Sequence, residues 1–157
     1  LLTGETFQHP IKPFKPDVLL EDGDIITLGN TSIKCVSTPG HTDGTMSFFF
    51  DVTDGEKKYR AGMFGGAGTN TLRKDFMLEH NLPFSNRNKM IDSINKIKNE
   101  KVDLFLGNHL NNNNTEQKLA MLESCDVNPF IANSQQEWND FLDKRLSLIN
   151  RIIEQDL

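Results

Sequence analysis

The sequence lacks several features that would define particular classes of protein. Its 157 residues include two cysteines, Cys35 and Cys125. That number is too small for a disulfide scaffold, and their spacing does not match a CxxC zinc or redox site. We therefore expect two buried thiols. Basic residues are outnumbered, with 17 Lys and Arg against 22 Asp and Glu for a net charge of −5. This balance argues against a nucleic-acid binder that relies on bulk positive charge.

Long apolar runs are missing as well. The longest, such as Met46 to Phe50, falls well short of the roughly 18 to 20 apolar residues that a membrane-spanning helix requires. No membrane span is therefore predicted. The chain opens at Leu1 without a methionine or a basic-then-apolar leader, so we expect any targeting segment to lie outside this sequence. The length and the 36% hydrophobic content suit a single domain over residues 1–157.

The first half of the chain has the pattern of short strands. Residues 1–16 hold three of the six prolines, which predicts an extended connector. After it, short β-rich segments separated by turn residues predict antiparallel hairpins, at residues 18–20, 25–28, 32–37, 46–52 and 57–63.

The second half changes to helical periodicity. Apolar stripes that include Met90, Ile91, Ile94 and Trp138 predict buried helix faces. The predicted elements are helices at 86–99, 115–123 and 135–154 and an apolar strand at 102–106. A capping box over 134–137 is expected to open the last helix. Strands first and helices later predict an α+β fold.

Two histidines follow apolar strands and are candidate ligands. His41 lies in Thr38-Pro39-Gly40-His41-Thr42-Asp43-Gly44, where proline and glycines bend the chain sharply. His109 ends the segment Leu106-Gly107-Asn108-His109. The plain alternative is that each ring makes a hydrogen bond within its own turn. His9 and His80 are expected to be surface histidines.

Both histidine segments resemble the metallo-beta-lactamase superfamily. Thr-Pro-Gly-His-Thr-x-Gly resembles its metal-binding signature, and 102–109 resembles the strand that delivers its last zinc ligand. The resemblance covers 17–110 and continues through Asn128-Pro129-Phe130 into the final helix. It implies one half of a four-layer αββα sandwich, closest to the beta-lactamase subclass that lacks a metal-ligating cysteine. Export to the periplasm or secretion is the matching expectation.

The resemblance also implies a two-zinc site and a reaction. His41 would complete a three-histidine site for one zinc, and His109 would join an aspartate and a histidine on the second. A zinc pair makes hydroxide available near neutral pH, and that hydroxide would attack a beta-lactam amide. Four residues are expected to border the substrate, namely Gly66, Asn70, Asn108 and Asn111. The alternatives are a lactone or ester substrate, such as an acyl-homoserine lactone, and a non-catalytic interaction module.

Three departures from the superfamily pattern shape the remaining expectations. The motif His-x-His-x-Asp-His, which supplies four ligands, is absent from this chain. Gly62 and Met63 stand where many relatives carry a bridging aspartate or a cysteine, which argues against a glyoxalase-like relative. Asp43 is expected to face solvent. We therefore expect the C-terminal half of an enzyme, inactive and weakly zinc-binding alone, whose sheet packs against a missing N-terminal half or a second copy.

Overall fold

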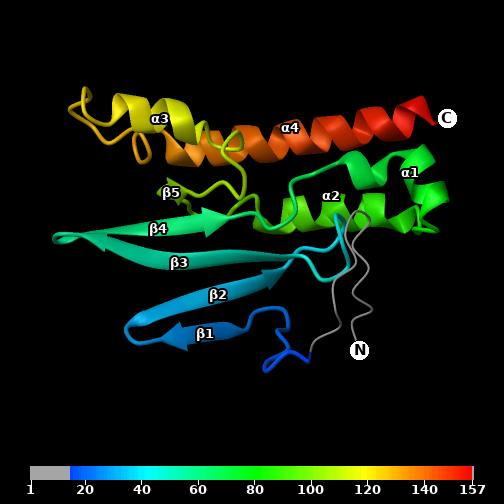
Figure 1. The fold of residues 1–157 in the computed structure, drawn as a ribbon, viewed down its shortest axis with the longest axis horizontal. Helices are drawn as coiled ribbons and strands as arrows, with labels where there is room; N and C mark the ends of the chain where they lie inside the picture. Colours follow the sequence, from blue (N-terminus) through cyan, green and yellow to red (C-terminus); the bar gives the residue numbers. More distant parts are fainter. Residues whose placement is uncertain (1–14, 157) are drawn as a thin grey trace.

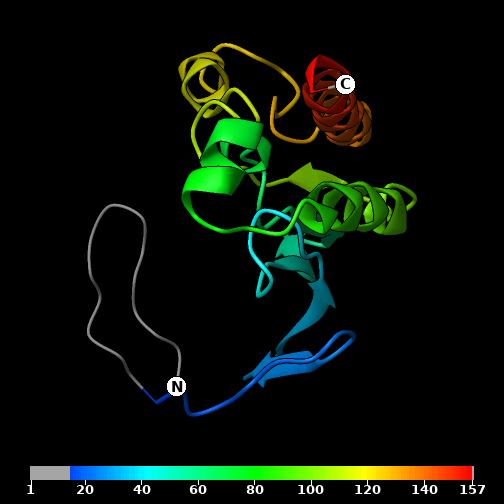
Figure 2. The same cartoon turned by 90° about the vertical axis from the view of Figure 1, so that its right-hand side faces the viewer.

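The computed structural model describes residues 15–156. They form a five-stranded sheet with helices against one of its faces (Figures 1 and 2). The strands lie in the order β1-β2-β3-β4-β5, and each pair is antiparallel except β4 and β5, which run parallel. The strands are β1 (Ile25–Leu28), β2 (Thr31–Ser37), β3 (Met46–Asp54), β4 (Lys57–Met63) and β5 (Leu104–Phe105). The helices are η1 (Asn70–Leu72), α1 (Lys74–Glu79), α2 (Ser85–Ile97), α3 (Thr115–Met121) and α4 (Ser134–Gln155).

Glycines at tight turns fix the pairing of the first four strands. Gly29 joins β1 to β2 and Gly55 joins β3 to β4, with φ values of +58° and +60°. Glycine adopts this left-handed conformation without a Cβ clash. Asp54 pairs with Lys57, so two residues form the second hairpin loop. The predicted antiparallel hairpins over 25–63 are confirmed, as is the α+β class.

The core lies between the sheet and helices α2 and α4. Trp138 of α4 packs edge-on against Phe49 of β3 and Phe105 of β5, with ring centroids 5.9 and 5.4 Å apart. Met90 and Ile94 of α2 are fully buried in the same cluster. Each such side chain contributes about 1.5–3 kcal/mol through burial. The core positions predicted from the helical stripes are confirmed.

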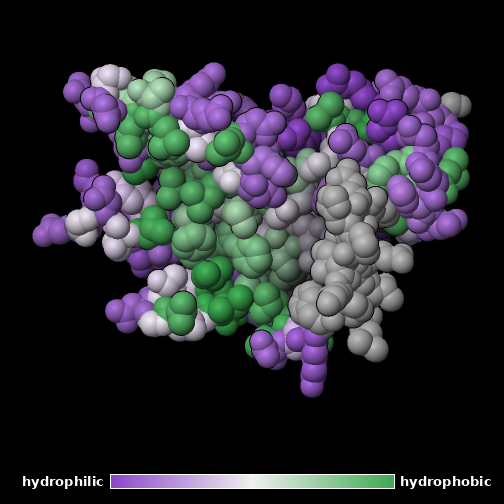
Figure 3. All heavy atoms as spheres, in the orientation of Figure 1, coloured by the Kyte–Doolittle hydropathy of each residue, from purple (hydrophilic) through white to green (hydrophobic). Residues whose placement is uncertain are grey.

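The opposite face of the sheet is apolar and is not covered by α2 or α4. Successive residues of a strand point to opposite faces, so Phe48 and Phe50 point away from the core residue Phe49. The strand register places Met63 opposite Phe48 and Ile33 opposite Phe50. These four half-buried side chains define what we call the open face. Figure 3 looks onto this side of the sheet, where apolar atoms gather over the strands.

Several expected elements differ from those observed. Residues 18–20 form no strand, and Val18 and Leu19 are 72% and 77% exposed. The strand expected over 102–106 shortens to β5, although backbone hydrogen bonds continue on either side of it, from Asp103 to the Arg60 carbonyl and from Leu106 to the Gly62 carbonyl. Helices η1 and α1 were not predicted, since so short a segment shows no full helical period. Of the predicted connector, the structure describes Lys15 and Pro16, which lie in neither helix nor strand; His9 lies outside the described residues.

Two local predictions are wrong. Ser134 does not cap α4, because its hydroxyl accepts the buried Phe105 N–H at 2.5 Å instead. Glu137, the expected capping partner, is paired with Lys118. Cys125 is exposed rather than buried, whereas Cys35 is buried, and both thiols are free. Of the helices in residues 15–156, none combines the length and apolarity that crossing a bilayer requires.

Candidate functional site

The loop between β2 and β3 presents His41, and helix α2 holds this loop in place. Gly40 has a φ of +139°, and a Cβ there would lie 2.3 Å from the Met90 Cβ. Glycine is therefore the residue that lets the loop touch the helix backbone. Ser93 donates a hydrogen bond of 2.7 Å from its hydroxyl to the Pro39 carbonyl. These two contacts fix the chain immediately before His41.

The His41 ring is oriented through one of its nitrogens. Nδ1 lies 2.9 Å from the Gly68 carbonyl oxygen. Because a carbonyl accepts and does not donate, Nδ1 carries the proton and the lone pair resides on Nε2. The Thr71 hydroxyl lies 3.4 Å from Nδ1 and donates to the His41 carbonyl at 3.4 Å. Metal-binding histidines are commonly fixed in this way, with the second ring N–H bonded to a carbonyl.

The glycine-rich loop after β4 packs directly against the His41 side chain. A Cβ at Gly66 would lie 2.7 Å from the His41 Cβ, and one at Gly68 would lie 3.1 Å from Cε1. These glycines therefore have a steric role beside the imidazole. The loop is a support for His41 as well as a border of the cavity described below.

His109 follows β5 in a turn held by asparagine side chains. Asn108 donates from Nδ2 to the Gly65 carbonyl at 2.8 Å, and Asn112 donates to Asn108 Oδ1 at 2.5 Å. Buried Asn113 donates to the Phe105 carbonyl at 2.9 Å. The asparagine run is therefore a set of structural hydrogen bonds. His109 itself is exposed, and no hydrogen bond to its ring is found within residues 15–156.

His41 and His109 line a common cavity of about 450 Å³, which we call the histidine cavity. It also brings together every other residue that the sequence placed near the substrate, namely Gly66, Asn70, Asn108 and Asn111. Helix α4 adds Arg145, for which the sequence offered no signal. Asp43 is exposed and paired with Lys89, as expected of a solvent-facing residue. His80 differs from expectation, because it is half-buried with its ring 4.2 Å from that of Phe76.

The histidine cavity fits one part of a metal site. The free Nε2 of His41 is a good zinc ligand, and the exposed His109 ring is accessible. A catalytic zinc normally takes three protein ligands. Within the described residues, no cluster of three His, Cys, Asp or Glu side chains could hold an ion. The residues present therefore do not complete a zinc site by themselves.

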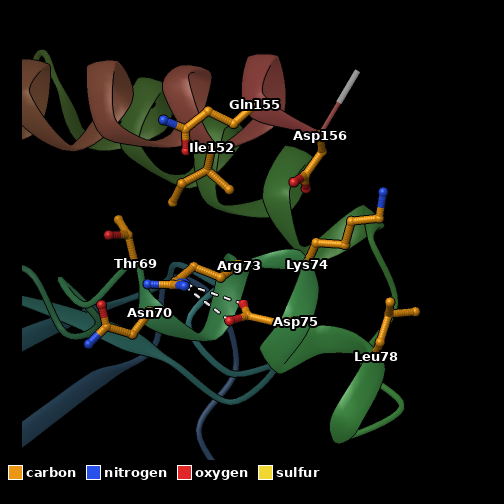
Figure 4. Close-up of a pocket in the computed structure, with 9 residues that line it drawn as sticks. All are labelled: Thr69, Asn70, Arg73, Lys74, Asp75, Leu78, Ile152, Gln155 and Asp156. Atoms are coloured by element: carbon orange, nitrogen blue, oxygen red, sulfur yellow. Dashed lines mark hydrogen bonds and ion pairs between the residues drawn. The ribbon is translucent and has the colours of Figure 1, made fainter.

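A second cavity of about 570 Å³ lies beside the first, between η1, α1 and the end of α4 (Figure 4). Thr69 and Asn70 line both cavities. Figure 4 shows Arg73 and Asp75 directed at one another, with their ion pair at 3.0 Å. The hydrogen bond from Arg73 holds the pKa of the Asp75 carboxyl below its usual range. The described lining of this second cavity contains no histidine or cysteine, so we place the chemistry in the histidine cavity.

Comparisons with known proteins show what this chain is similar to. No protein-family model matches the chain. It is 39% identical over 56 residues to a hydroxyacylglutathione hydrolase of Francisella tularensis subsp. novicida, covering 33% of this chain and 22% of that protein. A subclass B3 metallo-beta-lactamase of Bradyrhizobium japonicum superposes on 93% of the chain with a TM-score of 0.77 and 22% identity. A beta-lactamase from Chitinophaga pinensis superposes on 92% with a TM-score of 0.74 and 27% identity. These matches show that the chain has the fold of the metallo-beta-lactamases.

The chain spans about half the length of these solved structures, 53% in both cases. It thus carries one half of the metallo-beta-lactamase fold, as its sequence predicted. The local sequence match and the whole-chain structural match point to different members of the superfamily. The sequence match is to a hydroxyacylglutathione hydrolase, and the structural matches are to beta-lactamases.

Proposed function

We propose that this chain is the C-terminal half of a zinc-dependent hydrolase that opens the amide bond of beta-lactams. The observation that carries the proposal is the histidine cavity, into which two separate loops bring His41 and His109. His41 already has the tautomer that a metal ligand needs. The whole-chain likeness to a subclass B3 enzyme supports the same reaction class.

In this proposal each residue of the cavity has a defined role. His41 would bind one zinc through Nε2, and His109 would bind a second, with the remaining ligands coming from polypeptide outside this chain. Bound zinc supplies a water of lowered pKa and polarises the carbonyl under attack. Exposed Asn70 and Asn111 would donate hydrogen bonds to the substrate. Asn108 would position His109, because its side chain already bonds to Gly65 and Asn112. Gly66 would position His41, because the His41 side chain already packs against it.

A second candidate is hydrolysis of a glutathione thioester. The 39% identity over 56 residues to a hydroxyacylglutathione hydrolase favours it. His41 and His109 would bind metal in either reaction, because the walls of the cavity choose the substrate, although Gly62 and Met63 supply no bridging carboxylate. The two candidates are therefore distinguished by substrate.

The test uses the complete protein that contains this chain, loaded with zinc. Turnover of a chromogenic cephalosporin supports the first candidate, turnover of S-lactoylglutathione the second, and turnover of an acyl-homoserine lactone neither. His41→Ala and His109→Ala should each lower kcat/KM by at least about 100-fold. His80→Ala is the matched control, because His80 does not line the histidine cavity. A complete protein that binds zinc and hydrolyses none of the three substrates would contradict the proposal, as would an in-frame start codon near Leu1.

We also propose that the open face packs against a second sheet supplied by the N-terminal half of the fold. Phe48, Phe50, Ile33 and Met63 offer an apolar surface, and the chain spans about half of the matched structures. Burial of such a surface favours association. Light scattering of the 157-residue chain with and without the separately produced N-terminal half tests this. A 1:1 complex supports this packing. A homodimer that does not bind the N-terminal half, or a monomer that does not bind it, contradicts the packing.

The zinc affinity of this chain should be low when the other half of the fold is missing. The histidine cavity of this chain offers two imidazoles, so we expect the zinc dissociation constant of the chain alone to be weaker than about 1 µM. Titration with a competing chromophoric chelator measures this. Submicromolar binding by the monomeric chain would show that it holds further ligands.

A further inference from the structure

Among the described residues that line the histidine cavity, Arg145 is the one that carries a full charge. The other described lining residues are glycine, alanine, threonine, asparagine and the two histidines, and no carboxylate is among them. This local balance is the reverse of that of the whole chain, whose net charge is −5. The cavity therefore attracts anions although the protein as a whole repels them.

The guanidinium of Arg145 is held in place by aromatic rings. Its central carbon lies 4.6 Å from the centroid of the Phe141 ring, one helical turn earlier in α4. The Phe141 ring is in turn 5.0 Å from that of Phe105 in β5. Stacking on a fixed aromatic face orients the planar fork of an arginine. Arg145 is thus pre-arranged beside the two histidines.

Within residues 15–156, the half-buried Arg145 lacks the polar partner that the buried cations Arg87 and Lys118 possess. Arg87 pairs with Asp156 and donates to the Leu72 carbonyl at 2.8 Å, and Lys118 pairs with Glu137. The Nε of Arg145 is buried and has no hydrogen-bond acceptor within residues 15–156. Burial also lowers the pKa of this guanidinium. A charged group without an acceptor is costly, and the histidine cavity that Arg145 lines is where an acceptor can reach its guanidinium.

We propose that Arg145 binds the carboxylate of the substrate in the histidine cavity. The inference rests on the proposed function, because the carboxylate belongs to the molecule that is hydrolysed. A guanidinium forms two parallel hydrogen bonds with a carboxylate. Penicillins, cephalosporins and glutathione thioesters all carry this group, whereas acyl-homoserine lactones do not. Arg145 therefore selects the first three over the neutral lactone.

The first test measures anion binding by the metal-free 157-residue chain, so that it requires no turnover. Benzoate is titrated while the Arg145 Nε–H signal and the cavity amides are followed by NMR, with benzamide as the neutral isostere. Benzoate should shift these signals and benzamide should not. Arg145→Gln should abolish the response of the cavity amides. Arg151→Gln is the matched control, because Arg151 is exposed, lies on the same helix and does not line the cavity.

The second test uses the complete zinc-loaded protein. Arg145→Gln should raise KM for a substrate with a carboxylate by roughly 10- to 100-fold and change kcat little. Arg145→Lys, which keeps the charge, should recover part of the loss, and Arg151→Gln should have no effect. An unaltered benzoate response in Arg145→Gln overturns the inference, as does an equal loss in both glutamine variants. If benzoate binds through Arg145 but no substrate is hydrolysed, only the proposed function is contradicted. If a substrate is hydrolysed and Arg145→Gln leaves its KM unchanged, only this inference is contradicted.

Discussion

The contact between Gly40 and helix α2 gives a sharp test of how the fold presents His41. A Cβ at Gly40 would lie 2.3 Å from the Met90 Cβ, 2.5 Å from its Cα and 2.7 Å from its backbone nitrogen. These atoms belong to the middle of a helix, so they cannot move aside as the end of a flexible side chain can. Gly40→Ala must therefore lift the loop away from α2 or shift the helix.

The expected loss of stability has three parts. An alanine held at a φ of +139° is strained by about 1–2 kcal/mol. Overpacking against the helix adds about 1–3 kcal/mol. Lifting the loop also breaks the hydrogen bond from Ser93 to Pro39, which contributes about 1 kcal/mol. The total is about 3–6 kcal/mol, or a fall in Tm on the order of 10 °C for a chain of this size.

Gly44→Ala in the same loop is the control for this prediction. No atom lies within 4 Å of a Cβ at Gly44, so its effect should stay within about 0.5 kcal/mol. Urea unfolding followed by the fluorescence of the single tryptophan, Trp138, measures both variants. If Gly40→Ala unfolds at the same urea concentration as Gly44→Ala, the packing of this loop against α2 is refuted.

Three further predictions concern charges and thiols. The hydrogen bond from Lys96 lowers the pKa of Asp22, so this pair stabilises the fold above the unfolded-state pKa and its contribution disappears as the pH falls through the lowered value. Asp22→Asn should thus cost under about 1 kcal/mol at pH 7 and nothing near pH 2, as urea unfolding at both pH values measures. Glu137→Gln leaves the Lys118 ammonium, whose side chain is 7% exposed, without its partner. This variant should lose about 2 kcal/mol of the free energy of unfolding, and Lys118→Met should lose less. A thiol reagent should modify Cys125 at once and the other, buried cysteine only on unfolding, so one rapid equivalent in native protein and two in urea are expected.

The sequence predicted the two histidines but not what supports them. His41 and His109 follow strands within motifs, so their place at strand ends was readable. The sequence predicts only that Gly66 borders the substrate, because a glycine in a sequence does not show which atom approaches it. The close approach of the His41 ring is a tertiary contact between two separate loops. Only the fold reveals that Gly66 and Gly68 support the imidazole.

Arg145 was unpredictable for a related reason. On α4 it is a polar residue within an amphipathic pattern, and nothing in that pattern separates it from exposed Arg151. Its place in the cavity depends on how α4 crosses β5, which is set by the packing of Trp138 and Phe141. The capping box failed similarly, because the Phe105 N–H competed for the Ser134 hydroxyl. Tertiary partners overrode a correct local signal.

The two histidines contribute unequally to the proposed metal site. His41 is oriented by the Gly68 carbonyl and confined by glycines, so binding through Nε2 costs it little further ordering. His109 is exposed and must lose rotamer freedom when it binds. The first metal position is therefore largely prepared by this half of the fold. The remaining ligands must be placed to within about 0.5 Å by other polypeptide, and packing against the open face is the contact that would set that distance.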